Sequence, residues 1–147
     1  MKNIFLTDDD ADDCMLFSEA LREIYSEKEA KLTIANDGIK LMEALDRSVP
    51  PPPEVIFLDL NMPLKNGFEC LEEIRNTPKF REIPVVIFST SSNNDIVDKT
   101  YLHGANYYIC KPQSFNLLKK TIEFVLSFDA NTLKQQPKRE QFVIHLV

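Results

Sequence analysis

Short runs that are apolar at nearly every position alternate along this chain with longer amphipathic segments, and this alternation restricts the fold more than any other sequence feature. The short runs lie at residues 3–7, 31–35, 54–60, 84–90 and 105–111. The segments with apolar residues at helical spacing lie at residues 12–28, 38–48, 66–77, 94–104 and 115–128. Period and length together predict five strands and five helices in strict alternation.

The short runs also indicate how the strands pair. A strand that is apolar throughout, rather than at every second residue, is typical of a sheet buried on both faces. Such sheets are parallel, and right-handed βαβ crossovers place helices on both of their faces. We therefore expect a doubly wound α/β fold with a five-stranded parallel sheet and five helices.

Composition excludes several classes of function. The chain has 147 residues, which fit one domain, and a net charge of −6, which disfavours a nucleic acid or membrane partner. Cys14, Cys70 and Cys110 are far apart and form no CxxC pattern, so we expect reduced thiols rather than a disulfide framework or a zinc site. The apolar runs are too short for a signal peptide or a membrane span, which predicts a cytoplasmic location.

Polar side chains gather where the predicted strands end. In a doubly wound sheet, ligands bind beyond the carboxyl ends of the strands, so residues at these ends are the candidates for a functional site. Four of the five strands end in such residues: Asp8 and Asp9, Asp59 within "FLDLNMP", Ser89 and Thr90, and Lys111.

These residue types favour the chemistry of phosphoryl transfer. Three carboxylates on neighbouring strand ends repel one another unless a cation lies between them. With oxygen ligands and no nearby His or Cys, the preferred ion is Mg²⁺, which often also binds a phosphate oxygen. A lysine and a hydroxyl on two further strands supply a charge and a hydrogen-bond donor for a phosphoryl group.

Two other acidic residues have competing interpretations. Asp10 directly precedes a predicted helix, and we expect it to act as the N-cap rather than as a ligand. Asp13 lies one turn inside that helix, where a solvated helix face and a position at the rim of the site both remain open. His103 and His145 belong to no functional pattern.

Four segments together resemble the receiver domain of two-component response regulators. They are "DD" at 8–9, "FLDLNMPLKNG" at 57–67, "PVVIFS" at 84–89 and "YYICKP" at 107–112. The resemblance covers about residues 1–128 and implies a flavodoxin-like strand order of 2-1-3-4-5. It also implies a signalling phosphoacceptor rather than an enzyme with a substrate of its own.

The resemblance assigns a role to each matching residue. It implies that Asp59 is the phosphoacceptor and that Lys111 contacts the phosphoryl group. It implies a Mg²⁺ site formed by Asp8, Asp9, Asp59 and the backbone carbonyl of Asn61. It further implies a switch in which Ser89 supplies the hydroxyl and Tyr108 the aromatic ring. On phosphorylation of Asp59, Ser89 would draw the loop after the fourth strand inward, and the Tyr108 ring would turn inward to fill the space left beneath the fifth strand.

The resemblance also suggests partners and a domain organisation. We expect a receiver domain at residues 1–128 and a C-terminal extension at 129–147 without a separate output domain. The expected partners are a histidine kinase or hybrid kinase, a downstream protein, and a second copy bound through the fourth helix, fifth strand and fifth helix. The "DDDADD" segment and the prolines at 50–53 resemble those of single-domain regulators paired with phytochrome-type or hybrid kinases.

The end of the extension, "QFVIHLV" at 141–147, is apolar and β-prone. We expect it to pack on the domain or to pair with another copy, because an exposed apolar segment favours aggregation. A solvent-exposed tail remains the alternative.

Two other functions use a similar α/β sheet. A Mg²⁺-dependent phosphohydrolase also has a nucleophilic strand-end Asp, but enzymes of the haloacid dehalogenase type need a second Asp two residues later, where this chain has Asn61. A carboxamide cannot donate the required proton. An FMN-binding flavodoxin needs Ser, Thr or Gly after its first strand, and three Asp residues there would repel the phosphate.

Overall fold

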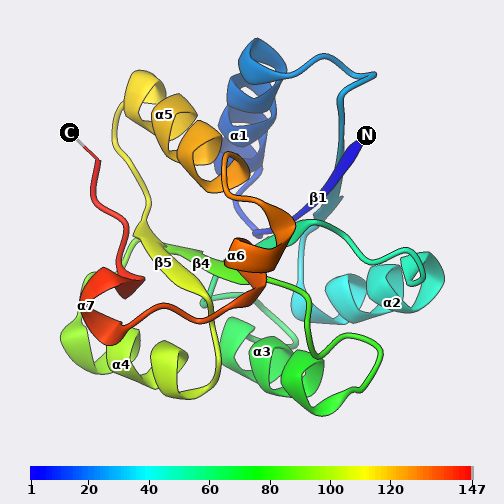
Figure 1. Ribbon diagram of the computed structural model, residues 1–147, viewed down its shortest axis with the longest axis vertical. Helices are drawn as coiled ribbons and strands as arrows, with labels where there is room; N and C mark the ends of the chain where they lie inside the picture. Colours follow the sequence, from blue (N-terminus) through cyan, green and yellow to red (C-terminus); the bar gives the residue numbers. More distant parts are fainter. Residues whose placement is uncertain (147) are drawn as a thin grey trace.

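A five-stranded parallel sheet forms the centre of the molecule in this computed structural model, which describes residues 1–146 (Figure 1). The strands are β1 (Lys2–Thr7), β2 (Ala30–Ala35), β3 (Val55–Leu58), β4 (Val85–Ser89) and β5 (Tyr107–Cys110). Their order in the sheet is β2-β1-β3-β4-β5, and every neighbouring pair is parallel. The predicted fold class and strand order are thus confirmed.

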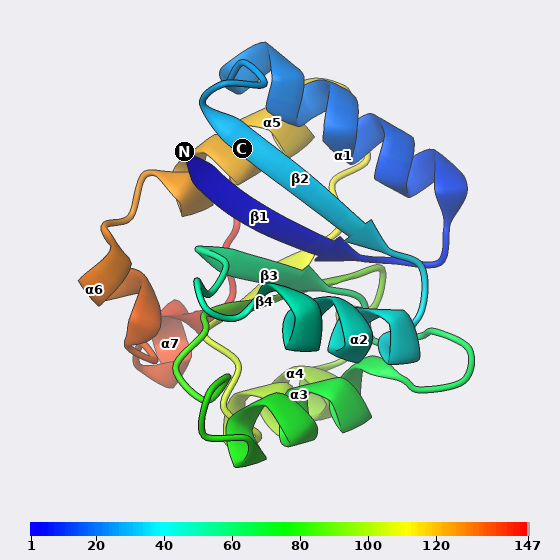
Figure 2. The ribbon, with the colours of Figure 1, turned by 90° about the vertical axis from the view of Figure 1, so that its right-hand side faces the viewer.

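Helices cover both faces of the sheet (Figure 2). The five that follow the strands are α1 (Ala11–Ile24), α2 (Gly38–Ser48), α3 (Gly67–Asn76), α4 (Asn94–Leu102) and α5 (Phe115–Leu126). Helices α1 and α5 lie on one face, and α2, α3 and α4 lie on the other. Two core clusters result, because successive strand residues point to opposite faces: Phe57 faces the α1 side, while Ile56 and Leu58 face the α3 side.

Helices α1 to α5 begin at residues whose side chains cap them. Asp10 accepts hydrogen bonds from the backbone of Asp12 (2.9 Å) and Asp13 (3.0 Å), which confirms its predicted role at the start of α1. Helix α1 ends at Ile24, four residues earlier than expected. The cause is a tight turn in which Glu29 and Ser26 exchange backbone and side-chain hydrogen bonds before β2.

The C-terminal extension forms two short helices that the alternating pattern did not predict, α6 (Ala130–Lys134) and α7 (Arg139–Phe142). It lies across the β5 edge of the sheet and contributes to both cores, with Leu133 in the α1–α5 cluster and Phe142 in the α2–α4 cluster. Val143 forms a parallel bridge with Tyr108. The predicted packing of the apolar tail on the domain is thus confirmed for residues 142–144, whereas Gln141 and His145 are exposed and Val147 lies outside the described residues.

The structure also bears on the cysteines and on membrane insertion. All three cysteines are free; Cys14 and Cys70 are buried, and Cys110 is half-buried at the end of β5. Burial raises the pKa of Cys14 to about 11, so this thiol is protonated at neutral pH. None of the helices formed by residues 1–146 combines the length and apolarity that a transmembrane helix requires.

Candidate functional site

Three carboxylates meet at the carboxyl ends of β1 and β3, as the sequence predicts. Asp8, Asp9 and Asp59 each place a side-chain oxygen within 4.8 Å of the others. They come together because β1 and β3 are neighbours in the sheet and Asp8 and Asp59 follow their strands directly. Asp8 and Asp59 are buried, and Asp9 is exposed. The cluster is therefore open to solvent on one side only.

The Asp59 carboxylate is held from two directions. Its Oδ1 accepts a hydrogen bond from the Leu60 amide at 2.8 Å, and its Oδ2 lies 3.5 Å from Nζ of Lys111. Burial raises the pKa of Asp59 to about 6, with the positive charge of Lys111 opposing the rise and the negative charge of Asp8 adding to it. Desolvation thus outweighs the nearby lysine, and a further cation would favour the charged carboxylate.

Lys111 lies at the end of β5 and points its ammonium group into the acidic cluster. Its Nζ lies 2.7 Å from Asp8 Oδ2 and 2.9 Å from Asp13 Oδ2, both closer than Asp59. The ammonium also lies 5.6 Å from the ring centroid of Phe88. Burial lowers the pKa of Lys111, but the bonds to Asp8 and Asp13 more than offset this, so its pKa is raised and the group is always charged.

Asp13 belongs to the site. Its carboxylate is only one-third exposed and binds Lys111 across 98 residues of sequence. Of the two interpretations left open for Asp13, the structure supports the rim of the site rather than a solvated helix face. The side chain of Asp10, in contrast, caps helix α1.

Ser89 and Tyr108 are linked through the loop after β4. Ser89 is fully buried, and its Oγ accepts a hydrogen bond from the Ser91 amide at 3.2 Å. Tyr108 Oη donates to the Ser91 carbonyl at 2.7 Å. The Tyr108 ring is 1% exposed, so it occupies the inward position that the sequence interpretation assigned to the activated state. Asn61 is exposed at the start of the loop that follows Asp59.

Gly67 is a site residue that the sequence reasoning missed. A Cβ atom on Gly67 would lie 2.3 Å from the Asp59 carbonyl oxygen and 2.8 Å from Leu60 Cα. The missing side chain lets the Gly67 amide donate to the Leu60 carbonyl at 2.9 Å, which closes the loop between β3 and α3. The Asn-Gly pair within "MPLKNG" was the available signal for such a close approach.

The donor set fits a divalent metal ion. Two buried carboxylates and one exposed carboxylate supply hard oxygen ligands, and the exposed one leaves a path for the ion to enter. Asp8 also has its Oδ1 fixed by the Asp10 amide at 3.0 Å, which leaves Oδ2 to face Lys111 or a cation. The predicted residues Asp8, Asp9 and Asp59 therefore form an acidic site of the kind that binds divalent cations.

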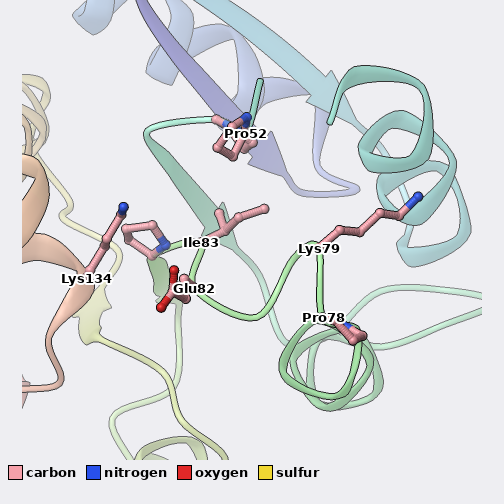
Figure 3. A pocket seen from close by; sticks show the side chains of 8 residues that line it. Pro52, Pro78, Lys79, Glu82, Ile83 and Lys134 are labelled. Carbon is pink, nitrogen blue, oxygen red and sulfur yellow. The ribbon is translucent and has the colours of Figure 1, made fainter. Parts of the chain in front are cut away.

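A separate pocket of about 130 Å³ lies at the opposite end of the sheet (Figure 3). Prolines that precede β3 and β4 line it together with Lys79, Glu82, Ile83 and Lys134. Lys79 is already paired with Asp46 at 3.1 Å, and within residues 1–146 no group of three acidic side chains converges there. The chemistry of the molecule therefore lies at the strand ends rather than in this pocket.

Comparison with known proteins agrees with this geometry. The response regulator receiver domain family matches residues 4–123. Response regulator Rcp1 from Synechocystis is 35% identical over 136 residues, which are 90% of this chain and 91% of Rcp1.

Solved structures of related proteins have the same architecture. The phosphorylated cyanobacterial phytochrome response regulator RcpA has a TM-score of 0.77 and 36% identity, over 86% of this chain and 94% of RcpA. The Mn²⁺-bound form of response regulator Rcp1 has a TM-score of 0.76 and 34% identity, over 93% of this chain and 99% of its own. The sheet order, the acidic site and these matches together show that the chain belongs to the response regulator receiver domain family, a family of signalling phosphoacceptors rather than of classical enzymes.

Proposed function

We propose that Asp59 accepts a phosphoryl group from a histidine kinase and that the chain acts as a response regulator. One observation carries the proposal: Asp59 is the buried carboxylate that lies beside both the acidic cluster and the ammonium of Lys111. An aspartate in this position can act as a nucleophile while the lysine balances the charge that the phosphoryl group brings.

The transfer forms one bond and breaks another. A carboxylate oxygen of Asp59 attacks phosphorus, and the bond from phosphorus to the donor histidine nitrogen breaks. The electron pair of the broken bond stays on that histidine nitrogen. With the other ring nitrogen already protonated, the imidazole leaves as a neutral ring, so this chain need not supply an acid. Lys111 and the hydroxyl of Ser89 then donate hydrogen bonds to the phosphoryl oxygens, so these two residues bind the product on Asp59.

We assign the metal role to Asp8, Asp9, Asp59 and the backbone carbonyl of Asn61, with Mg²⁺ as the ion. When bound, Mg²⁺ neutralises charge on the transferring group. The three carboxylates supply the ligands, and their mutual distances support this assignment. The related response regulator Rcp1 has a solved Mn²⁺-bound form, so a divalent ion of the same charge binds to that relative.

The kinase partner is proposed to be of the phytochrome type. RcpA is a cyanobacterial phytochrome response regulator, and the solved relatives AtBRR and RtBRR are bacteriophytochrome response regulators. The receiver unit is proposed to comprise residues 1–128, with residues 129–147 as an extension.

The output surface is proposed to comprise α4, β5, α5 and the extension that covers them. Ser89, the Ser91 backbone and Tyr108 connect the site with β5 by hydrogen bonds. The Ile144 amide continues this path by donating to the Tyr108 carbonyl at 2.9 Å. A change at Ser89 therefore reaches the extension through one residue of β5. A downstream protein or a second copy bound on this side would contact the extension as well.

A phosphohydrolase has less support than a phosphoacceptor. The residue two positions after Asp59 is Asn61, which cannot serve as a general acid, and the family match covers most of the chain.

The test is phosphorylation by acetyl phosphate with Mg²⁺, measured by intact mass. We expect one added phosphoryl group on the wild type, none on Asp59→Asn, and a normal yield on Asp12→Asn, an exposed carboxylate of the same region. Equal labelling of Asp59→Asn and wild type would contradict the assignment. Loss of labelling after chelation of Mg²⁺ separates metal dependence from nonspecific acylation.

A further inference from the structure

We propose that Asp13 is a positioning residue that holds the ammonium group of Lys111 beside Asp59 while the metal ion occupies the acidic cluster. The inference rests on the function proposed above and adds a residue outside the expected metal and phosphoryl ligands. Asp13 Oδ2 accepts a hydrogen bond from Lys111 Nζ at 2.9 Å, whereas Asp59 Oδ2 lies farther from the same nitrogen, at 3.5 Å.

The two close partners of Lys111 differ in what else they can bind. Asp8 belongs to the cluster of three carboxylates that fits a divalent cation, whereas Asp13 does not. A cation bound to Asp8 repels the ammonium of Lys111 and neutralises the negative charge of the Asp8 carboxylate. Asp13 is then the carboxylate that still attracts Lys111, so the lysine keeps a partner in the loaded site.

Asp13 is itself well fixed. It lies in the first turn of α1, where its amide donates to the capping carboxylate of Asp10 at 3.0 Å. Helix α1 packs against α5, the helix that follows Lys111 in the chain. A lysine side chain has four flexible methylene groups and loses about 2 kcal/mol of rotamer entropy when ordered. A fixed carboxylate that orders this side chain in advance lowers the cost of placing its charge at the phosphoryl group.

Lys111 can bind Asp13 and a phosphoryl oxygen together, because an ammonium group has three donors. The Asp13 contact therefore orients Lys111 without consuming its capacity to bind the phosphoryl group. Without Asp13, the remaining partners of Lys111 are Asp8 and Asp59, which both belong to the acidic cluster, so the metal ion would compete with the lysine for both. Removal of the Asp13 charge should consequently weaken both phosphoryl binding and metal binding.

The experiment measures two affinities of the 147-residue chain by calorimetry: that of Mg²⁺ alone, and that of beryllofluoride at saturating Mg²⁺. Asp13→Asn is expected to weaken beryllofluoride binding about tenfold, as the loss of one charge-assisted hydrogen bond does. It is also expected to weaken Mg²⁺ binding. Asp12→Asn is the matched control, because it removes an exposed carboxylate from the same helical turn and leaves the Lys111 contact intact.

A double-mutant cycle with Lys111→Met shows whether Asp13 acts through the lysine. In the Lys111→Met background, Asp13→Asn is expected to change either affinity by less than about twofold, the error range of independent sites. Asp13→Glu keeps the charge and is expected to recover part of the lost affinity, which a general defect of α1 would not allow.

Three results would overturn the inference. They are equal effects of Asp13→Asn and Asp12→Asn, a full Asp13→Asn effect without Lys111, and tighter beryllofluoride binding by Asp13→Asn, which would make Asp13 a competitor for the lysine. If the wild type binds Mg²⁺ but neither beryllofluoride nor a phosphoryl group, the proposed function fails. In that case the Mg²⁺ affinities of the same variants still decide the link between Asp13 and Lys111.

Discussion

Replacement of Asp59 by Asn should stabilise the metal-free protein at neutral pH, although it removes the proposed nucleophile. Asp59 is 7% exposed, and burial raises its pKa from 3.8 to about 6, with Lys111 opposing and Asp8 reinforcing the rise. The folded protein therefore holds this proton more tightly than the unfolded chain does. The stability that the wild type gains from this bound proton is complete below pH 3.8 and is lost as the pH rises through about 6.

The magnitude follows from the two pKa values. A rise from 3.8 to about 6 corresponds to roughly 3 kcal/mol, since each unit is about 1.4 kcal/mol. Because Asp9 leaves the acidic cluster exposed to solvent, screening reduces this to roughly 1.5 kcal/mol. Asn does not titrate, so the stability of Asp59→Asn relative to wild type should increase by this amount between pH 4 and pH 7. The change corresponds to a rise in melting temperature of roughly 3–6 °C for a chain of this size.

The assay is urea unfolding of both proteins in chelator between pH 4 and pH 7.5. Mg²⁺ serves as the internal control, because an ion held by Asp8, Asp9 and Asp59 would bind the folded state only and should stabilise the wild type more than Asp59→Asn. Addition of Mg²⁺ should therefore raise the free energy of unfolding of the wild type relative to that of Asp59→Asn. A stability difference that stays constant with pH, or that favours the wild type more strongly at pH 7 in chelator, would refute the electrostatic reasoning.

Three further variants test the packing around the site and the extension. Phe142→Ala removes a fully buried ring that packs on Tyr101 at a centroid distance of 5.0 Å, and should lower the free energy of unfolding in urea by up to roughly 3–4 kcal/mol. His145 is exposed, so His145→Ala should change this free energy by less than about 0.5 kcal/mol. Equal effects of the two variants would contradict the docking of the extension. Asn106→Leu should lower the free energy of unfolding by roughly 2–4 kcal/mol, because this buried amide donates to two α6 carbonyls at 3.1 and 3.2 Å and accepts from the Val85 amide at 2.9 Å. An unchanged free energy of unfolding would show that water replaces these hydrogen bonds. Gly67→Ala should lower the free energy of unfolding by roughly 1–3 kcal/mol and slow phosphorylation, since its Cβ would lie 2.3 Å from the Asp59 carbonyl oxygen. An unchanged rate of phosphorylation would show that the loop moves without disturbing the site.

Much of the site could be predicted because parallel strands end at a common edge. The alternation of apolar runs placed Asp8, Asp9 and Asp59 at that edge, and the structure brings their oxygens within 4.8 Å. The same rule placed Lys111 and Ser89 at this edge, and Lys111 reaches the cluster with its ammonium group. Such a prediction needs only strand ends and residue types, both of which are local properties of the sequence.

Contacts between distant elements could not be predicted in this way. Helical spacing places Asp13 on α1, but it does not show which side chain of another element lies opposite, and Lys111 is 98 residues away. Helices α6 and α7 have five and four residues, too few for a periodic signal. Their positions depend on tertiary bonds such as those of Asn106, which accepts from Val85 and donates to Leu133.

The position of Tyr108 shows how such a contact alters a functional expectation. The sequence interpretation has this ring turning inward upon activation, into space left by Ser89. In the structure the ring is already buried, its hydroxyl binds the Ser91 carbonyl, and Phe142 of the extension packs 6.2 Å away. An outward rotation would break the hydrogen bond and leave a void beside Phe142, so the extension itself favours the inward orientation. Because the extension and the ring stabilise each other, phosphorylation and docking of the extension should be coupled, and the coupling is reciprocal: the free energy by which phosphorylation changes the docking equals the free energy by which docking changes phosphorylation.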